Sequence, residues 1–176
     1  EYFKGGAADI SGKNLLVYDI IKKYLIRILK YDRSIAPFTL ISLEKQYETE
    51  VVVAVSETKN IAVRIGGIVD RLDELDGSIR VVDYKTGKTD GDVGKLETLF
   101  KQGEVKNKPA FQTLLYAMAV SHSMPDFSTV KPAVYGARAV FNDSFSPLFR
   151  FGGEDLIFNA VKPEFEELLG KLLADI

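Results

Sequence analysis

The 176-residue chain contains no cysteine. Disulfides, thiolate zinc sites and iron-sulfur clusters are therefore excluded within this chain, and a metal site here has to be built from oxygen ligands. The sequence also lacks any apolar run approaching the ~18 residues of a membrane-spanning helix, and its beginning lacks the layout of a signal peptide. These absences predict a cytoplasmic protein with no membrane attachment.

The chain has little net charge, −2 at pH 7 with a pI near 5.6. Domains that bind nucleic acid through their own surface are usually basic. Affinity of this chain for DNA is thus expected to come largely from elsewhere. Apolar residues are plentiful at 46%, which is enough for one well-packed domain over residues 1–176 with no obvious break.

Two patterns of apolar residues predict the secondary structure. Recurrence at helical spacing over residues 14–31 predicts a helix with a packing face. Residues 38–55 are rich in β-branched side chains and predict an extended strand or a hairpin, whereas the polar, glycine-containing stretch 86–108 predicts a loop. The remaining predicted elements are strands at 61–72, 78–84, 133–141 and 145–151, a helix at 109–121 opened by Pro109, and a helix at 154–174. The order α-β-β-β-α-β-β-α predicts an α/β (α+β) fold with a mixed sheet flanked by helices.

The dipeptide Asp76-Gly77 predicts a tight hairpin turn, because both turn positions need a positive φ angle that glycine adopts at little cost. A two-residue turn sets the register of the strands on either side of it. This register places Leu72 opposite Val81 on one face of the hairpin. It places Asp73 opposite Arg80 on the other face, and both kinds of pair stabilise a sheet.

The same register brings two carboxylates together. Asp70 lies opposite Asp83, and Lys85 follows on the same face because side chains alternate with period two. Two carboxylates about 4 Å apart repel by about 4 kcal/mol at an effective dielectric constant of roughly 20. A hard cation such as Mg²⁺ offsets this repulsion through carboxylate, carbonyl and water oxygens, and Tyr84 can add its backbone carbonyl. The alternatives are that Lys85 alone neutralises the pair, or that a β-bulge moves Asp70 elsewhere.

Three motifs follow one another in the chain: Gly67-x-x-Asp70-Arg71, Asp83-Tyr84-Lys85-Thr86-Gly87 and Gln112-x-x-x-Tyr116. In this combination and order the chain resembles the RecB-type branch of the PD-(D/E)XK nuclease superfamily, from about Phe38 to the C-terminus. The resemblance implies a restriction-endonuclease-like fold with an α-β-β-β-α-β core. It also implies a DNA exonuclease domain of recombination and double-strand-break repair, similar to the C-terminal nuclease domain of AddAB-type helicase-nuclease subunits. DNA and a helicase or helicase-like module are the partners implied.

The resemblance also implies roles for single residues. Asp70 and Asp83 become the ligands of Mg²⁺ or Mn²⁺, together with the backbone carbonyl of Tyr84. The cation would lower the pKa of a water and polarise a phosphate oxygen, and Lys85, the catalytic lysine, would stabilise charge developing on phosphorus. Glu44 resembles an acidic residue that binds the metal through water or holds Lys85. The alternative for Glu44 is an ordinary exposed glutamate.

Gln112 and Tyr116 are spaced i, i+4, which places them on one face of the predicted helix. The resemblance implies that they support the site or contact DNA. A surface glutamine beside a packed tyrosine is the alternative. Arg71 and Thr86, which belong to the first two motifs, are assigned the same role of DNA binding or site support.

The chain departs from the branch that it resembles in one respect. Members usually carry a metal-binding histidine on a helix well before the first strand, whereas the single histidine here is His122, for which we expect a surface position at a helix end. We therefore expect the chain to be an N-terminally truncated fragment of a larger polypeptide that begins downstream of that histidine and binds metal weakly in isolation. Glu164, Glu166 and Glu167 in the last predicted helix are expected to form a solvated face.

Other interpretations compete with an active nuclease. An inactive nuclease-like domain, serving DNA binding or scaffolding in a helicase complex, is favoured by the missing histidine and the acidic balance. The joint presence of Asp70, Asp83 and Lys85 argues against it. A glycosidase needs two carboxylates separated by a sugar-sized gap and no lysine beside them. Gly87-Lys88-Thr89 imitates the end of a nucleotide-binding P-loop, but Val82 stands where that pattern needs glycine.

Overall fold

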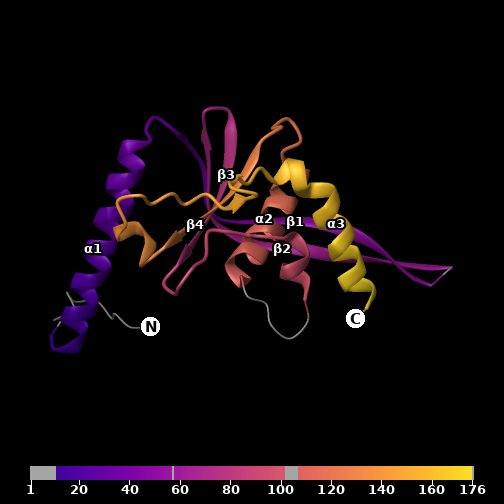
Figure 1. Cartoon of the computed structure of the whole chain (residues 1–176), viewed down its shortest axis with the longest axis horizontal. Helices are drawn as coiled ribbons and strands as arrows, with labels where there is room; N and C mark the ends of the chain where they lie inside the picture. The colour runs from indigo at the N-terminus through magenta and orange to yellow at the C-terminus, as the bar shows by residue number, and fades with distance from the viewer. Residues whose placement is uncertain (1–10, 57, 102–106, 176) are drawn as a thin grey trace, which may run out of the picture. The chain divides into compact units, whose positions relative to one another are not determined.

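A computed structural model of the chain describes residues 11–56, 58–101 and 107–175. The residues group into two compact units, Glu1–Ala36 and Pro37–Ile176. The first unit contains helix α1, Lys13–Ser34, which confirms the helix predicted over residues 14–31 (Figure 1). The expectation of one domain over the whole chain stays a prediction, as does the packing face expected on α1.

The second unit is built on a four-stranded sheet with the strand order β1-β2-β3-β4. Strands β1, β2 and β3 are antiparallel neighbours, and β4 runs parallel to β3, so the sheet is mixed as predicted. A parallel neighbour needs a crossover connection, which helix α2 provides between β3 and β4. The bounds are β1 Thr39–Ser56, β2 Lys59–Leu75, β3 Ser78–Lys85, β4 Val130–Gly136 and α2 Lys108–Ser123.

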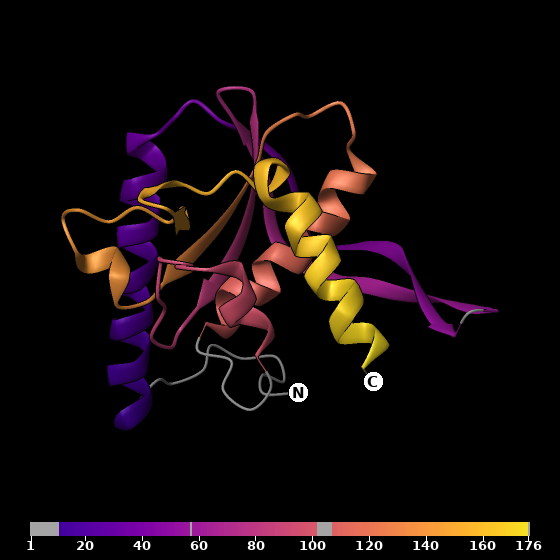
Figure 2. The same cartoon turned by 45° about the vertical axis from the view of Figure 1, so that its right-hand side comes forward.

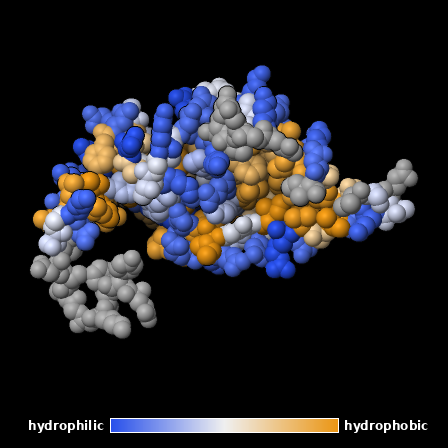
Figure 3. All heavy atoms as spheres, turned by 90° about the horizontal axis from the view of Figure 1, so that it is seen from below, coloured by the Kyte–Doolittle hydropathy of each residue, from blue (hydrophilic) through white to orange (hydrophobic). Residues whose placement is uncertain are grey.

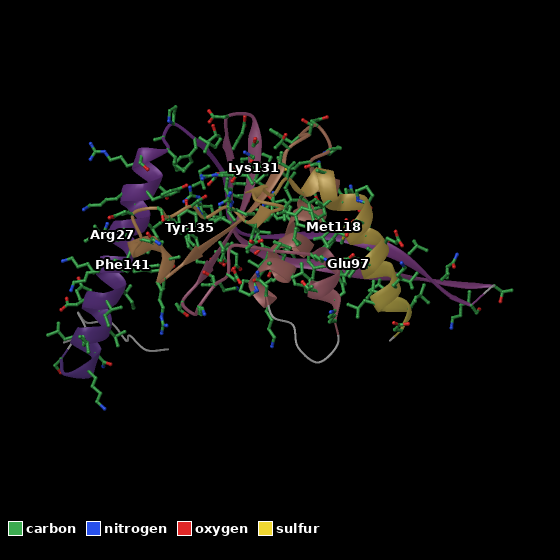
Figure 4. All side chains as sticks on the ribbon, in the orientation of Figure 1. Arg27, Glu97, Met118, Lys131, Tyr135 and Phe141 are labelled. Carbon is green, nitrogen blue, oxygen red and sulfur yellow. The ribbon has the colours of Figure 1, made fainter. Side chains whose placement is uncertain are left out.

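Helix α2 lies across the sheet with helix α3, Phe158–Ala174, beside it (Figures 1 and 2). Leu114 and Met118 of α2 are fully buried, and so is Phe165 of α3 (Met118 is labelled in Figure 4). The ring of Phe165 lies 5.3 Å from that of Phe100, which belongs to a short 3₁₀ helix, Leu96–Phe100. The segment predicted as a loop is therefore anchored in the core at this point.

Beyond β3, strands β1 and β2 continue as a two-stranded arm (Figure 1). Figure 3 shows hydrophobic side chains to the right of centre, where α3 and this arm lie, with hydrophilic side chains around them. Val52 and Ile61 are among the exposed apolar residues of the arm. In the part of the chain that the structure describes, no helix combines the length and the apolar character needed to cross a bilayer.

The alternation of side chains along β2 is interrupted at Asp70. Val69 and Leu72 are both fully buried in the same core, although a spacing of three puts two residues on opposite faces of a regular strand. Across the strand pair, Glu44 of β1 has a φ of 47°, and the register of Cα partners skips both Glu44 and Asp70. Irregularities of this kind re-aim side chains and are common near functional sites.

The C-terminal third differs from the prediction. Strand β4 ends at Gly136, and residues 139–141 form a 3₁₀ turn rather than a strand. The strand predicted over 145–151 is wrong except for Arg150–Phe151, because the residues before this pair reach β4 only through isolated backbone bonds. Gly152 and Gly153, with φ angles of 61° and 90°, turn the chain directly after it. Arg150–Phe151 pairs with Glu154–Asp155, so α3 begins at Phe158 instead of residue 154.

Candidate active site

The hairpin of β2 and β3 has the predicted register. Leu72 pairs with Val81 and Asp73 with Arg80, and the ladder ends at the pair of Arg71 with Val82. It therefore stops one pair before the predicted opposition of Asp70 and Asp83. Beyond this point a side chain of β2 links the two strands.

Asp70 bridges the opening between the strands. Its Oδ2 accepts a hydrogen bond of 2.8 Å from the backbone N–H of Tyr84. The neighbouring residue, Lys85, directs its carbonyl to the other edge of β3, where it accepts a 2.8 Å bond from the backbone N–H of Ala137. Successive residues of a strand point their backbone groups to alternate edges, so the carbonyl of Tyr84 faces the same opening as Asp70.

Asp83 is almost fully buried, with 2% of its surface exposed. Lys85 Nζ donates a 2.9 Å hydrogen bond to Asp83 Oδ1 and lies 2.8 Å from Oδ2 without aligning a hydrogen bond to it. Asp83 Oδ2 is shielded from solvent, and no group among the described residues donates a hydrogen bond to it. A buried carboxylate oxygen in this state is costly unless a further positive group reaches it.

The pKa of Asp83 also reflects the cost of burying its charge. Burial raises the pKa of the Asp83 carboxyl above its ordinary value. Lys85 lowers that pKa in part, through its hydrogen bond and its charge, and the charge of Asp70 raises it. The two carboxylates thus act on each other, and one lysine does not offset the cost of the buried charge.

These groups fit a hard divalent cation. The opening offers the carboxylates of Asp70 and Asp83 and the carbonyl of Tyr84, and the solvent-shielded Oδ2 of Asp83 lacks a donor among the described residues. Mg²⁺ commonly uses one or two carboxylates and keeps several waters. The described residues hold no group of three or more acidic or histidine side chains in metal-binding range, so Glu44 does not complete such a cluster. Glu44 lies exposed on β1, and its role as a ligand stays a prediction.

The third motif packs against the first. Gln112 Nε2 donates a 2.7 Å hydrogen bond to the hydroxyl of Tyr116, which confirms that both lie on one face of α2. The ring of Tyr116 lies over Gly67, where an added Cβ would be 2.9 Å from Cε1 and 3.2 Å from the hydroxyl oxygen. The glycine of the first motif therefore allows α2 to approach β2 beside Asp70.

We expect Gly67→Ala to destabilise the protein by about 1–3 kcal/mol, because the new methyl group overpacks the contact with Tyr116. Chemical denaturation of the wild type, Gly67→Ala, Tyr116→Ala and the double variant measures this coupling. Gly87→Ala is the matched control, since a Cβ at Gly87 meets no atom within 4 Å. Equal losses for Gly67→Ala in the presence and absence of the Tyr116 ring would contradict the packing argument.

Arg71 lies on the opposite face of the hairpin from the carboxylates. Its Nε donates a 2.6 Å hydrogen bond to Asp73 Oδ2, and Asp73 also accepts two bonds from Arg80, of 2.6 and 2.9 Å. The predicted pair of Asp73 with Arg80 is confirmed. The bond of Arg71 to Asp73 was not predicted, because Arg71 was assigned to DNA binding or site support from its motif alone. Only 5% of Arg71 is exposed, which favours site support over a DNA contact. Thr86 is exposed directly after β3.

Asn107 is a second residue that the sequence interpretation missed. It is buried, it precedes α2, and its Oδ1 accepts a hydrogen bond from the N–H of Ala110. Its Nδ2 donates to the carbonyls of Asp90 and Asp92, at 3.0 and 3.3 Å. The loop that leaves the site is thus tied to the start of α2, and an asparagine just before Pro109 was the available signal.

His122 lies exposed in the last turn of α2, as predicted. Its Nδ1 is 3.0 Å from the hydroxyl of Thr49 on β1, and its Nε2 is 3.4 Å from Glu166 Oε1 on α3. The expectation that Glu166 belongs to a merely solvated face is therefore corrected. The single histidine joins three elements of the fold.

Comparison with known proteins agrees with the motifs. Residues 9–154 match the family model of the PD-(D/E)XK nuclease superfamily. An ATP-dependent helicase/deoxyribonuclease subunit of Streptococcus uberis is 40% identical over 76 residues, which cover 43% of this chain and 6% of that protein. No solved structure matches the chain significantly. Because the family match spans the described sheet and the motif residues on it, the chain belongs to the PD-(D/E)XK nuclease superfamily.

Proposed function

We propose that this chain is a DNA nuclease domain that uses Mg²⁺ or Mn²⁺ at the opening between β2 and β3. The observation that carries the proposal is the buried Asp83, whose Oδ2 lies 2.8 Å from Lys85 Nζ but accepts no aligned hydrogen bond among the described residues, and whose pKa is raised. Stability alone gives no reason to bury this carboxylate near a second one. A divalent cation held by both carboxylates gives such a reason.

In this proposal Asp70, Asp83 and the Tyr84 carbonyl hold the cation, and Glu44 contributes through water. When bound, the cation supplies Lewis-acid activation of the phosphodiester. Lys85 stabilises the negative charge that develops on phosphorus, and its ammonium is already held beside Asp83. This electrostatic role suits a lysine whose ammonium is already paired with a carboxylate.

The supporting residues take positions around this centre. Tyr116 packs on Gly67 and holds α2 against the strand that carries Asp70, and Gln112 orients the Tyr116 hydroxyl through a hydrogen bond. In this proposal the buried Arg71 supports the site from the opposite face of the hairpin, and Thr86, which is exposed, contacts the DNA backbone. These roles concern binding and orientation, not the chemical step.

The relative in Streptococcus uberis suggests the substrate and the partner. That protein is a helicase/deoxyribonuclease subunit, and this chain covers 6% of its length. We infer a domain that acts on DNA beside a helicase or helicase-like module, in recombination and double-strand-break repair in the cytoplasm. The modest net charge of −2 is consistent with DNA being delivered by such a partner.

A second candidate function is favoured by one observation. Lys85 Nζ lies within 2.9 Å of both oxygens of Asp83, so the lysine can neutralise the carboxylate without a metal. The chain would then be an inactive nuclease-like domain that binds DNA or serves as a scaffold in a helicase complex.

Calorimetric titration with Mn²⁺, run beside cleavage of end-labelled linear DNA, separates the two functions. We expect the 176-residue chain to bind Mn²⁺ and to release labelled nucleotides only while the metal is present, with chelator as the blank. Asp70→Asn is expected to lose both, because one of two carboxylate ligands is removed. DNA binding without cleavage at saturating Mn²⁺ would reject the nuclease in favour of the scaffold.

A further inference from the structure

The face of the hairpin opposite the carboxylates carries a buried charged network. Asp73 is fully buried, and Arg71 and Arg80 are 5% and 2% exposed. Asp73 binds Arg80 through two hydrogen bonds and Arg71 through one, all of 2.6–2.9 Å. Short, charge-assisted hydrogen bonds of this kind hold their partners in defined orientations. Asp73 is thus the central residue that orients both guanidinium groups.

Arg71 links this network to Tyr84. Its Nη1 donates a 3.3 Å hydrogen bond to the hydroxyl of Tyr84. The Arg71 guanidinium also lies 4.8 Å from the ring centre of Phe38 and 5.9 Å from that of Tyr135, and Tyr135 packs at 5.4 Å on the Tyr84 ring (Tyr135 is labelled in Figure 4). The side chain of Tyr84 is therefore held from two sides.

These contacts lie where the backbone pairing of β2 and β3 ends. The backbone ladder ends at the pair of Arg71 with Val82, so backbone pairing no longer sets the spacing of β2 and β3 beyond it. At the next positions Arg71 reaches the Tyr84 hydroxyl on one face, and the Asp70 carboxylate accepts a hydrogen bond from the Tyr84 backbone N–H. Arg71 follows Asp70 directly, and Tyr84 lies between Asp83 and Lys85.

We propose that Asp73 is a positioning residue, which through Arg71 holds the Tyr84 peptide and the Asp70 carboxylate in the arrangement that receives the divalent cation. This inference rests on the proposed function for its metal. A buried network on the opposite face of the sheet thus orients the residues of the site. Residues that orient metal ligands from behind typically change metal affinity about 10- to 100-fold when they are replaced.

Two variants of the 176-residue chain test the proposal. Asp73→Asn keeps the shape of the side chain and weakens the hold on Arg71, and Tyr84→Phe removes only the hydroxyl that Arg71 reaches. Leu169→Ala is the control, since Leu169 is buried on α3 and is no part of the network. A milder Leu169→Val serves if the stability losses need closer matching.

The first readout needs no metal. Hydrogen exchange of the backbone N–H at position 84 reports on its bond to Asp70, and we expect both variants to speed it at least about tenfold beyond the other β3 amides. The control is expected to speed exchange along β3 evenly. The second readout is the Mn²⁺ dissociation constant, expected to rise about tenfold in both variants and to stay unchanged in the control.

The outcomes separate the inference from the proposed function. Unchanged relative exchange at position 84 in both variants overturns the positioning role of Asp73, whatever the metal does. The same holds if the control moves exchange and affinity as much as the variants. A wild type that binds no Mn²⁺ overturns the proposed function, and the exchange readout then still decides whether Asp73 holds the Tyr84 peptide.

Discussion

Asp83→Asn is expected to abolish Mn²⁺ binding and to reduce metal-dependent DNA cleavage about a thousandfold, equivalent to about 4 kcal/mol of transition-state stabilisation. The amide keeps the shape of the carboxylate but cannot offer a charged oxygen to the cation. Calorimetry and single-turnover cleavage measure the two losses. Asp126→Asn is a suitable control because Asp126 is exposed and lies outside the hairpin.

The same substitution is expected to stabilise the metal-free protein. Burial raises the pKa of Asp83 in the folded state, so the charged form weakens the fold at pH values above that pKa. The wild type should therefore lose stability as pH rises from the ordinary carboxyl pKa through the raised one, and the asparagine variant should not. Thermal unfolding in chelator across this range measures the difference. A variant that is less stable than the wild type at neutral pH would show that Lys85 outweighs the cost of burial.

Lys85→Ala is expected to reduce cleavage about a hundredfold or more while Mn²⁺ affinity is kept or increased. The lysine competes for both oxygens of Asp83, so its removal leaves them to the cation while the charge on phosphorus loses its partner. Calorimetry measures the Mn²⁺ affinity, and single-turnover rates at saturating Mn²⁺ measure the loss of cleavage. Lys88→Ala is the matched control, three positions along the exposed loop.

The Lys85 result also separates the two candidate functions. In an inactive domain the lysine only neutralises Asp83, so its removal would change stability and leave no cleavage to lose. Cleavage that is unaffected by Lys85→Ala would contradict the role assigned to Lys85. Another positively charged group near the site would then have to stabilise the charge on phosphorus.

Local patterns were sufficient for most of the sheet. The Asp76-Gly77 turn predicted the register of β2 and β3, because a two-residue turn leaves one way to pair the flanking strands. They were insufficient for residues 145–151, whose apolar alternation looks like a strand. There the backbone bonds reach β4 only at single points, such as Val134 N–H to the carbonyl of Pro147, so no regular ladder forms.

The candidate site likewise has features that local patterns predicted and features that they did not. The spacing of the motifs predicted that Asp70, Asp83 and Lys85 lie on one hairpin. This prediction requires only the turn and the two-residue period of a strand. The interruption of β2 at Asp70 depends on β1 across from it, and the sequence of the hairpin indicated it only as an alternative, a β-bulge at Asp70.

The sequence by itself determined the turn, the register and the set of motifs, since each depends on residues that are close along the chain. Only the tertiary structure decided what surrounds them: the approach of Tyr116 to Gly67, the capture of Arg71 by Asp73, and the hold of Asn107 on the loop. The physical reason is that burial and hydrogen-bond partners are set by packing between elements. A charged residue such as Arg71 is expected at the surface until the fold shows what covers and pairs it.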